Sequence, residues 1–248
     1  MGFIDRGLEL LFPSNIYCIC CGSVIDKTRY YALCDSCAPK FHWLSAKTCA
    51  KCGKILSPDY RHDLCYDCML YGHDFDKGYT CVQYGLYERS VLMDFKYRGK
   101  SHIGRKLGDI LFDRMALEEQ DFDLVVPVPM YRKKQIQRGY NQAAVMAQKL
   151  ASRWGIPCAA RLLERTRSTR PMKGLGAIER MENLEGAFSV SRDNHYELEG
   201  RSVLLVDDIY TTGSTMDACS KALRKAGAEK VFALSFACGA NIPPKQCV

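Results

Sequence analysis

The 248-residue sequence contains few prolines and no long hydrophobic run. No stretch approaches the roughly 18 consecutive apolar residues that indicate a membrane span, and no basic and then apolar signal peptide opens the chain. We therefore expect a soluble, cytoplasmic protein without membrane insertion. Only 9 prolines and a hydrophobic content of 47% predict a folded, globular protein and exclude a disordered one.

Neither sign of charge is in large excess, since 35 basic and 28 acidic residues give a net charge of +7. The basic residues are unevenly distributed: eleven Lys or Arg and a single acid, Glu164, lie between Pro129 and Lys173. A solvated basic face explains part of this cluster. The same surface would suit a multiply charged anion or single-stranded nucleic acid, with Tyr131 and Tyr140 available for stacking.

Cysteine is abundant, and its spacing is regular. Eight of the 14 cysteines form four C-x-x-C pairs. The first two pairs recur 31 residues later, and 12 residues separate the pairs within each half. This spacing indicates an internal duplication, whose members are Cys18/Cys21, Cys34/Cys37, Cys49/Cys52 and Cys65/Cys68.

The duplication predicts two structural zinc sites in a double zinc ribbon over residues 1–70, with units at 18–37 and 49–68. Four thiolates suit tetrahedral Zn²⁺ and leave no open position for catalysis. Units of about 20 residues are too short to bury a core without a metal. Redox C-x-x-C sites, an iron–sulfur cluster and disulfides are the competing interpretations, and the duplicated spacing disfavours them. Cys20 offers a spare thiol, and exchange of ligands between the repeats stays open.

Residues 202–227 combine a strand, two acids, a hydroxyl-rich loop and a helix. The apolar run 202–206 predicts a buried strand, followed by Asp207 and Asp208. A helical apolar period begins at Met216, and Gly227 is suited to end the helix. The loop between them would present unpaired N–H groups to a phosphate, and carboxylates there would bind sugar hydroxyls or lie beside Mg²⁺. A phosphate held together with a diol describes a ribose 5-phosphate.

The remaining sequence from residue 79 onwards predicts an α/β domain over 79–248, joined to the ribbons by a linker near 69–78. The patterns predict strands at 79–87, 123–129, 158–163 and about 231–237, one or two helices over 91–111 with a break at 96–100, a helix at 141–154 and a polar loop at 165–183. In an open α/β sheet, the ligand belongs at the carboxyl ends of the strands.

The segment VLLVDDIYTTGST, residues 203–215, resembles the signature of type I phosphoribosyltransferases. That resemblance implies a parallel sheet with helices on both faces and phosphoribosyl pyrophosphate (PRPP), bound with Mg²⁺, as the ligand. It implies that Asp207 and Asp208 bind the ribose hydroxyls. It also implies that the loop cradles the 5′-phosphate with Tyr210, Thr211, Thr212, Gly213, Ser214 and Thr215.

Nearly the whole chain is similar to the ComF family, bacterial proteins associated with DNA uptake in natural transformation. The shared strings include LFP at 11–13, the paired ribbons, KYRG at 96–99, VPVP with RGYNQ, and GLGAIERMENLEGAF at 174–188. The resemblance implies a competence protein with PRPP as a ligand and DNA-uptake machinery as a partner. One departure is Met172, where the family usually has glutamine, and it puts a polar contact of the mobile loop in question.

If PRPP binds, Arg138 is the best candidate to assist the departing pyrophosphate, with Arg132, Lys133 and Lys134 as further candidates. Asp208 would stabilise a cationic sugar, and the loop 165–183 would close over the site. About eleven residues follow the last strand, too few for a carboxyl-terminal segment that holds an acceptor. That role falls to the ribbons, to residues 85–110 or to nothing.

Two functions therefore remain. The first is a PRPP-binding protein of DNA uptake that also binds single-stranded DNA, which the family resemblance favours. The second is a salvage phosphoribosyltransferase that transfers ribose 5-phosphate to a free base or amine. Neither the acceptor, nor whether catalysis occurs, nor the oligomeric state follows from the sequence.

Overall fold

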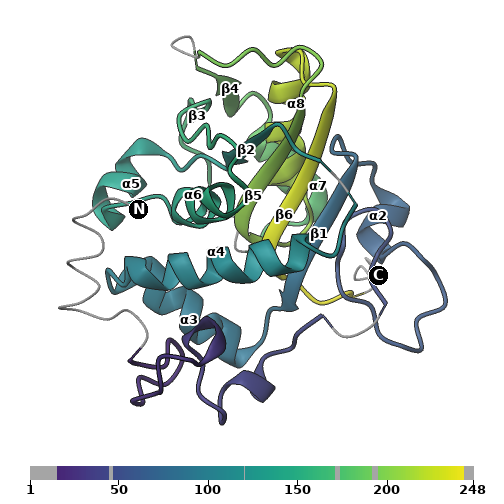
Figure 1. Ribbon diagram of the computed structural model, residues 1–248. Helices are drawn as coiled ribbons and strands as arrows, with labels where there is room; N and C mark the ends of the chain where they lie inside the picture. The colour runs from purple at the N-terminus through teal and green to yellow at the C-terminus, as the bar shows by residue number, and fades with distance from the viewer. Residues whose placement is uncertain (1–15, 45–46, 120, 171–173, 192–194, 243–248) are drawn as a thin grey trace.

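A computed structural model describes residues 16–44, 47–119, 121–170, 174–191 and 195–242 (Figure 1). Its centre is a four-stranded sheet in the order β1-β6-β5-β2, in which every neighbouring pair is parallel. The strands are β1 (Lys77–Gln83), β2 (Leu124–Pro127), β5 (Ser202–Tyr210) and β6 (Lys230–Cys238). All four are largely buried apolar runs, as expected of a parallel sheet that is covered on both faces.

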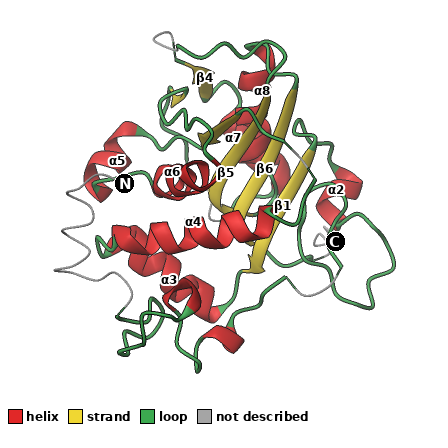
Figure 2. Cartoon of the chain, viewed as in Figure 1, coloured by secondary structure: helices red, strands yellow, loops and turns green. Residues whose placement is uncertain are grey.

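Helices cover both faces of this sheet (Figure 2). One face carries α3 (Leu86–Tyr97), α4 (Ser101–Met115) and α6 (Gln142–Trp154). The other carries α8 (Ser214–Lys225) with α7 (Ala177–Leu184) beside it, and a small antiparallel pair of β3 (Leu163–Arg165) and β4 (Phe188–Val190). The expected α/β fold, a parallel sheet with helices on both faces, is confirmed.

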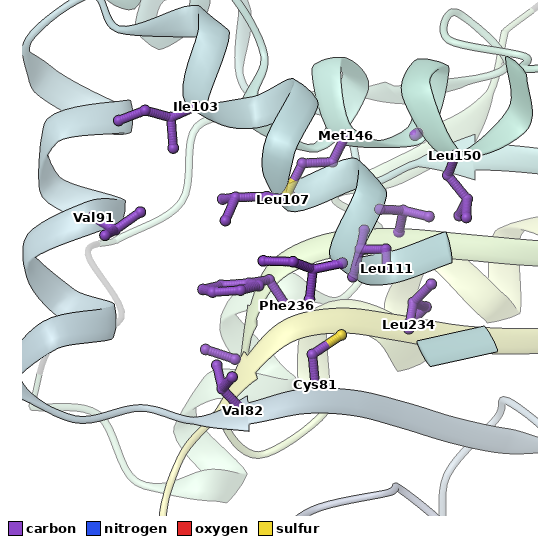
Figure 3. Close-up of a cluster of buried hydrophobic side chains, with 14 of the residues drawn as sticks. Cys81, Val82, Val91, Ile103, Leu107, Leu111, Met146, Leu150, Leu234 and Phe236 are labelled. Atoms are coloured by element: carbon purple, nitrogen blue, oxygen red, sulfur yellow. The ribbon is translucent and has the colours of Figure 1, made fainter. Parts of the chain in front are cut away.

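The sheet separates two hydrophobic cores. Side chains alternate along a strand, so Leu204 and Val206 of β5 enter the first core, whereas Val203 and Leu205 enter the second. Figure 3 shows side chains of the first core, in which Leu107 of α4 and Met146 of α6 lie over the sheet. We call the α3–α4–α6 side the first core and the α8 side the second core.

The two cysteine repeats pack into different cores. The first ribbon, residues 16–41, contains the short 3₁₀ turns Tyr30–Ala32 and Ala38–Lys40 and contributes Leu33 and Phe41 to the first core. The second ribbon, residues 47–70, ends in α2 (Tyr66–Leu70) and contributes Leu56 to the second core. In Figure 1 the first ribbon lies below α3, and the second lies beside β1 next to α2. Neither ribbon is therefore an appendage hanging from the sheet.

The second ribbon also covers the edge strand β1. Gly78 donates its N–H to the Lys51 carbonyl at 2.7 Å, and the Thr80 hydroxyl donates to the Gly53 carbonyl at 2.6 Å. The segment 71–76, predicted to be a linker, packs against the domain, since Phe75 is fully buried in the second core. A division into units 1–70 and 79–248 stays a prediction.

Most of the expected elements are present, with three corrections. The break between α3 and α4 falls inside 96–100, and Asn141 caps α6 by accepting the Ala143 N–H at 3.1 Å. The strand predicted at 158–163 is wrong, because this segment makes only a single bridge from Cys158 to Val125 and β3 begins at Leu163. The polar loop 165–183 contains most of α7, and the basic stretch after residue 131 is the short helix α5 (Arg132–Arg138).

Two features used for the family resemblance, the LFP at 11–13 and Met172, lie outside the described residues. Within the described part of the chain, no helix has the length and apolar character that crossing a membrane requires.

Candidate functional site

Each cysteine repeat gathers four thiols at one point. Within each set, all sulfur atoms lie within 4.8 Å of one another, the sets being Cys18, Cys21, Cys34 and Cys37, and Cys49, Cys52, Cys65 and Cys68. The measured S···S separations of 3.7 and 3.6 Å match the roughly 3.8 Å edge of a tetrahedron with Zn–S bonds of about 2.3 Å. The residues therefore fit two structural zinc ions, and the ligands pair within each repeat. Cys20 belongs to neither set.

The two sites share their supporting hydrogen bonds but differ in burial. In the first, the Cys34 N–H points to the Cys18 sulfur at 3.4 Å; in the second, the Cys65 N–H points to the Cys49 sulfur at 3.2 Å. Such backbone donors orient thiolate ligands. Cys21 is exposed, whereas three of the four thiols of the second set are buried. The second zinc site is therefore the one enclosed by the rest of the protein.

The hydroxyl-rich loop lies at the carboxyl end of β5. The chain turns at Gly213, whose φ of +86° is a left-handed conformation suited to glycine, and α8 starts at Ser214. The first turn of α8 leaves backbone N–H groups without helical acceptors, at the positive end of the helix dipole. A shallow hollow of about 20 Å³ opens there, lined by Asp207, Ile209, Tyr210, Thr211, Gly213, Thr215 and Met216. The predicted loop is thus a strand end, a tight turn and a helix start around one hollow.

The polar side chains of the loop do not all face this hollow. Thr215 lines it, while the hydroxyls of Thr212 and Ser214 lie 3.0 Å apart and hydrogen-bond each other. The hydroxyl of Thr211 accepts a hydrogen bond from Arg180 Nη1 at 2.9 Å. Tyr210 also borders the hollow, but it is only 3% exposed and packs its ring in the second core. Its side chain is therefore chiefly a core side chain.

The two acids lie within β5, which runs on to Tyr210, and not beyond the end of a shorter strand. Successive side chains of a strand point to opposite faces. Accordingly, Asp208 Oδ2 pairs with Lys96 Nζ of α3 at 2.8 Å on the first-core side. Asp207 lies on the second-core side, where Arg165 and Cys219 are near enough to interact with it. The acids therefore face different surroundings.

Those surroundings change the charge of Asp207. Burial, together with the neighbouring charge of Asp208, raises the pKa of Asp207 to about 7, although the hydrogen bond from the Asp208 N–H and the charges of Lys96 and Arg165 oppose the shift. Asp207 Oδ1 accepts the Asp208 N–H at 2.8 Å. Near neutral pH this carboxyl is therefore able to take up or release a proton.

Comparison with known proteins agrees with this geometry. Residues 7–69 match a double zinc ribbon domain and residues 138–241 match a phosphoribosyl transferase domain. Competence protein F of Haemophilus influenzae is 34% identical over 224 residues, which covers 88% of this chain and 94% of that protein. The chain belongs to the ComF family.

Two other similar proteins have related names. DNA utilization protein YhgH of Escherichia coli is 29% identical over 190 residues, covering 74% of this chain and 80% of that protein. Competence protein ComFC of Bacillus subtilis is 25% identical over 202 residues, covering 79% of each. Ribbons and transferase-type domain therefore occur here in the arrangement that the family resemblance implied.

In this ComF-family chain, the basic candidates have different positions. Arg138 donates to the Tyr97 hydroxyl at 3.0 Å, with its guanidinium 4.9 Å from that ring, and Tyr97 follows Lys96. Arg138 therefore lies on the same side of the sheet as the ion pair of Lys96 with Asp208. Arg132 is exposed on the first turn of α5 and makes no ion pair among the described residues. Tyr140 hydrogen-bonds the Phe95 carbonyl and packs on the Phe95 ring, so it supports α6 and is not a free stacking platform.

Four residues near the loop were not found from the sequence: Lys96, Arg180, His73 and Asp217. Lys96 stands inside the KYRG string, but the acid it pairs with is distant in the chain. His73 Nδ1 lies 2.9 Å from Asp217 Oδ2, and its Nε2 lies 3.3 Å from the Tyr210 hydroxyl. Nothing in the composition of a predicted linker signals such a histidine.

Proposed function

We propose that this ComF-family protein binds PRPP with Mg²⁺ at the loop 211–215, and that it serves DNA uptake in natural transformation by also binding single-stranded DNA. The observation that supports it most is the arrangement at the end of β5: Asp207, the glycine turn and the first turn of α8 line one hollow, and Asp208 follows Asp207 in the strand. Eight thiols arranged for zinc require a reducing compartment, which favours the cytoplasm.

The backbone N–H groups at the start of α8 would hold the 5′-phosphate of PRPP. The free oxygens of Asp207 and Asp208 would accept hydrogen bonds from the ribose hydroxyls. Asp208 keeps one oxygen for this purpose, because only its Oδ2 is paired with Lys96. Mg²⁺, when bound, would neutralise part of the pyrophosphate charge. Lys96 and Arg138 then supply positive charge beside the same site.

The helix α5 is the best candidate surface for single-stranded DNA. It carries Arg132, Lys133 and Lys134 on a helix without a buried side chain, and Tyr97 is 62% exposed beside it with Arg138 over its ring. Cationic side chains that follow a backbone, together with an exposed aromatic ring, are the usual means of binding single strands without sequence preference.

Calorimetric titration with PRPP, with and without Mg²⁺, tests the first part. Magnesium is omitted and not chelated, because a chelator would also remove zinc. We expect Mg²⁺-dependent binding in the wild type and at least a tenfold loss, about 1.4 kcal/mol, in the double variant Asp207→Asn/Asp208→Asn. Asp123→Asn is the matched control, because Asp123 accepts the Ser202 N–H at the opposite end of β5. Binding that is absent in the wild type, or unchanged in the double variant, contradicts the proposal.

Titration of a fluorescent single-stranded oligonucleotide at rising salt tests the second part. The affinity should fall steeply with salt, with a slope of about 0.7 per phosphate contact, and Lys133→Ala/Lys134→Ala should reduce that slope. Lys225→Ala/Lys230→Ala removes the same charge from the end of α8 and the start of β6, and should have little effect. An affinity independent of salt is the contrary result. Pyrophosphate release from PRPP that depends on a free base would instead indicate a salvage transferase.

A further inference from the structure

A buried polar chain runs beneath the phosphate loop. Asp217, in the first turn of α8, is 7% exposed and accepts hydrogen bonds from His73 Nδ1 at 2.9 Å and from the Asp74 N–H at 3.0 Å. The opposite nitrogen of His73 lies 3.3 Å from the Tyr210 hydroxyl. The His73 side chain is only 1% exposed, and its ring stacks on Phe75. His73 therefore connects Tyr210, which precedes the loop, with Asp217, which follows it; we call these three residues the link.

The loop backbone rests directly on this link. A Cβ placed on Gly213 would lie 2.6 Å from the Tyr210 hydroxyl oxygen and 2.7 Å from His73 Cε1. The glycine at this turn therefore lies directly against the Tyr210 and His73 side chains, with no space for a larger residue. The direction of the backbone N–H groups at the start of α8 therefore depends on where these two side chains stand.

The same link continues into the second ribbon. The Tyr210 ring shares the second core with Cys49, Cys52 and Cys65, and Lys54 Nζ lies 6.0 Å from the ring centroid. Lys54 is 2% exposed and pairs with Asp67 at 2.6 Å. A zinc centre with four thiolates carries more negative charge than the metal neutralises, and Lys54 is the buried cation placed beside it. The Ile55 N–H also points to the Cys238 sulfur at the end of β6, at 3.5 Å.

The first ribbon provides a natural comparison. One of the tyrosines of the first ribbon, Tyr31, donates a hydrogen bond from its hydroxyl to Asp113 of α4 at 2.8 Å, on the first-core side. Among the described residues, no hydrogen bond or ion pair joins the first ribbon to the loop 211–215. A tyrosine hydroxyl thus fastens the first ribbon to α4, whereas the second ribbon packs against Tyr210 at the base of the phosphate loop.

We propose that the second ribbon positions the phosphate loop through Tyr210 and His73, so that these two residues are positioning residues for a bound phosphoryl group. The inference rests on the proposed PRPP site for its ligand, but not for the contacts themselves. The folded second ribbon holds Lys54 against the ring of Tyr210. Tyr210 and His73 in turn lie against Gly213 and set the position of the turn. Asp217, which accepts a hydrogen bond from His73, holds the first turn of α8.

The test removes the contact between Tyr210 and His73 by changing each of the two residues in turn. Tyr210→Phe removes only the hydroxyl, and His73→Asn keeps a donor in place of Nδ1 for Asp217 while removing the nitrogen that faces Tyr210. Each variant should weaken PRPP binding by about five- to tenfold, the cost of one lost hydrogen bond. The double variant should bind as well as either single one, because both changes remove the same contact. Tyr31→Phe is the matched control and should bind as the wild type does.

A second readout separates the two proposals. In ¹⁵N-glycine-labelled protein, the Gly213 amide resonance should move in Tyr210→Phe and stay in Tyr31→Phe, whether or not PRPP binds. During stepwise zinc removal followed with a metal indicator, that resonance should stay while the exposed first site empties and move when the second does.

If the wild type fails to bind PRPP, the proposed function fails while the resonance still decides the inference. Equal affinities and an unmoved Gly213 resonance in Tyr210→Phe would overturn the inference alone, as would additive losses in the double variant. Should His73→Asn not fold, the pair Tyr210→Phe and Tyr31→Phe carries the test by itself.

Discussion

The two cysteine repeats have the same spacing and the same backbone hydrogen bonds, yet the protein uses them differently. The first ribbon packs on α4 in the first core, and its Cys21 is exposed. The second ribbon is built into the second core, beneath the turn where β5 becomes α8. A duplicated metal site can therefore pack on the outer helices of one face of a sheet and beneath a strand-to-helix turn on the other.

Loss of the metal ligands should show the largest difference between the ribbons. Cys52→Ser/Cys65→Ser removes buried ligands and should lower the free energy of unfolding by about 4 kcal/mol, because metal binding supplies folding free energy and the second core opens with it. The equivalent change, Cys21→Ser/Cys34→Ser, should cost about half as much, since Cys21 is already exposed. Denaturant unfolding followed by circular dichroism, with zinc content measured for each variant, checks this. Equal losses would mean that the ribbons are equivalent.

The next largest loss of stability is expected at one member of a glycine pair. Gly22 and Gly53 are equivalent in the repeat and have similar φ angles of +77° and +70°. A Cβ on Gly53 would meet the Gly78 carbonyl oxygen at 2.4 Å, whereas a Cβ on Gly22 has open space. Gly22→Ala should therefore cost about 1 kcal/mol from backbone strain alone, and Gly53→Ala about 3 kcal/mol because β1 must also shift. Thermal unfolding of the two variants measures this, and matching melting temperatures would refute the close packing of the second ribbon on β1.

The smallest expected effect on stability concerns Asp207, the acid that faces the second core. The pKa of Asp207 is raised from 3.8 to about 7, chiefly by burial, so the folded state holds a proton that the unfolded state releases. The stability from the protonated carboxyl is complete below the unfolded pKa and is lost as the pH rises through about 7. Asp207→Asn cannot ionise and should be more stable than the wild type by about 2 kcal/mol at about pH 8, roughly half of what the full pKa difference gives, because the side chain is partly exposed and screened by solvent; near pH 4 the difference should fall below about 1 kcal/mol.

Urea unfolding across this pH range gives the measurement. Asp123→Asn, at the other end of β5, should change stability by less than about 0.5 kcal/mol at either pH. A pH-independent difference between Asp207→Asn and the wild type would show that the carboxyl is already ionised throughout.

Local patterns in the sequence were sufficient for the thiol sets, the glycine turn and the helix that follows it, because each depends on residues close in the chain. The positions of the ribbons were not predictable, since they depend on which core each ribbon enters. The position of the Tyr210 side chain could not be predicted for the same reason. A tyrosine beside a phosphate loop suggests a ligand contact, but its ring packs among residues of the second ribbon and its hydroxyl lies next to His73.

The helix α7 was missed for another reason. Its buried residues, Asn183 and Leu184, are adjacent at its last turn and give no helical period, and its start depends on the Glu179 carboxylate accepting the Gly176 N–H at 2.7 Å. Its Arg180 contact with Thr211 places this segment beside the loop 211–215, and closure of this segment over a ligand stays a prediction. Similarly, Lys96 could be found only by knowing that α3 ends beside Asp208.

The most direct test of PRPP binding compares two glycines, one in the loop that follows β5 and one in the first ribbon. In ¹⁵N-glycine-labelled protein, addition of PRPP with Mg²⁺ should move the Gly213 amide resonance saturably and leave that of Gly22 in place. A Gly213 resonance that stays fixed up to millimolar PRPP would contradict the proposal that the loop between β5 and α8 holds the phosphate.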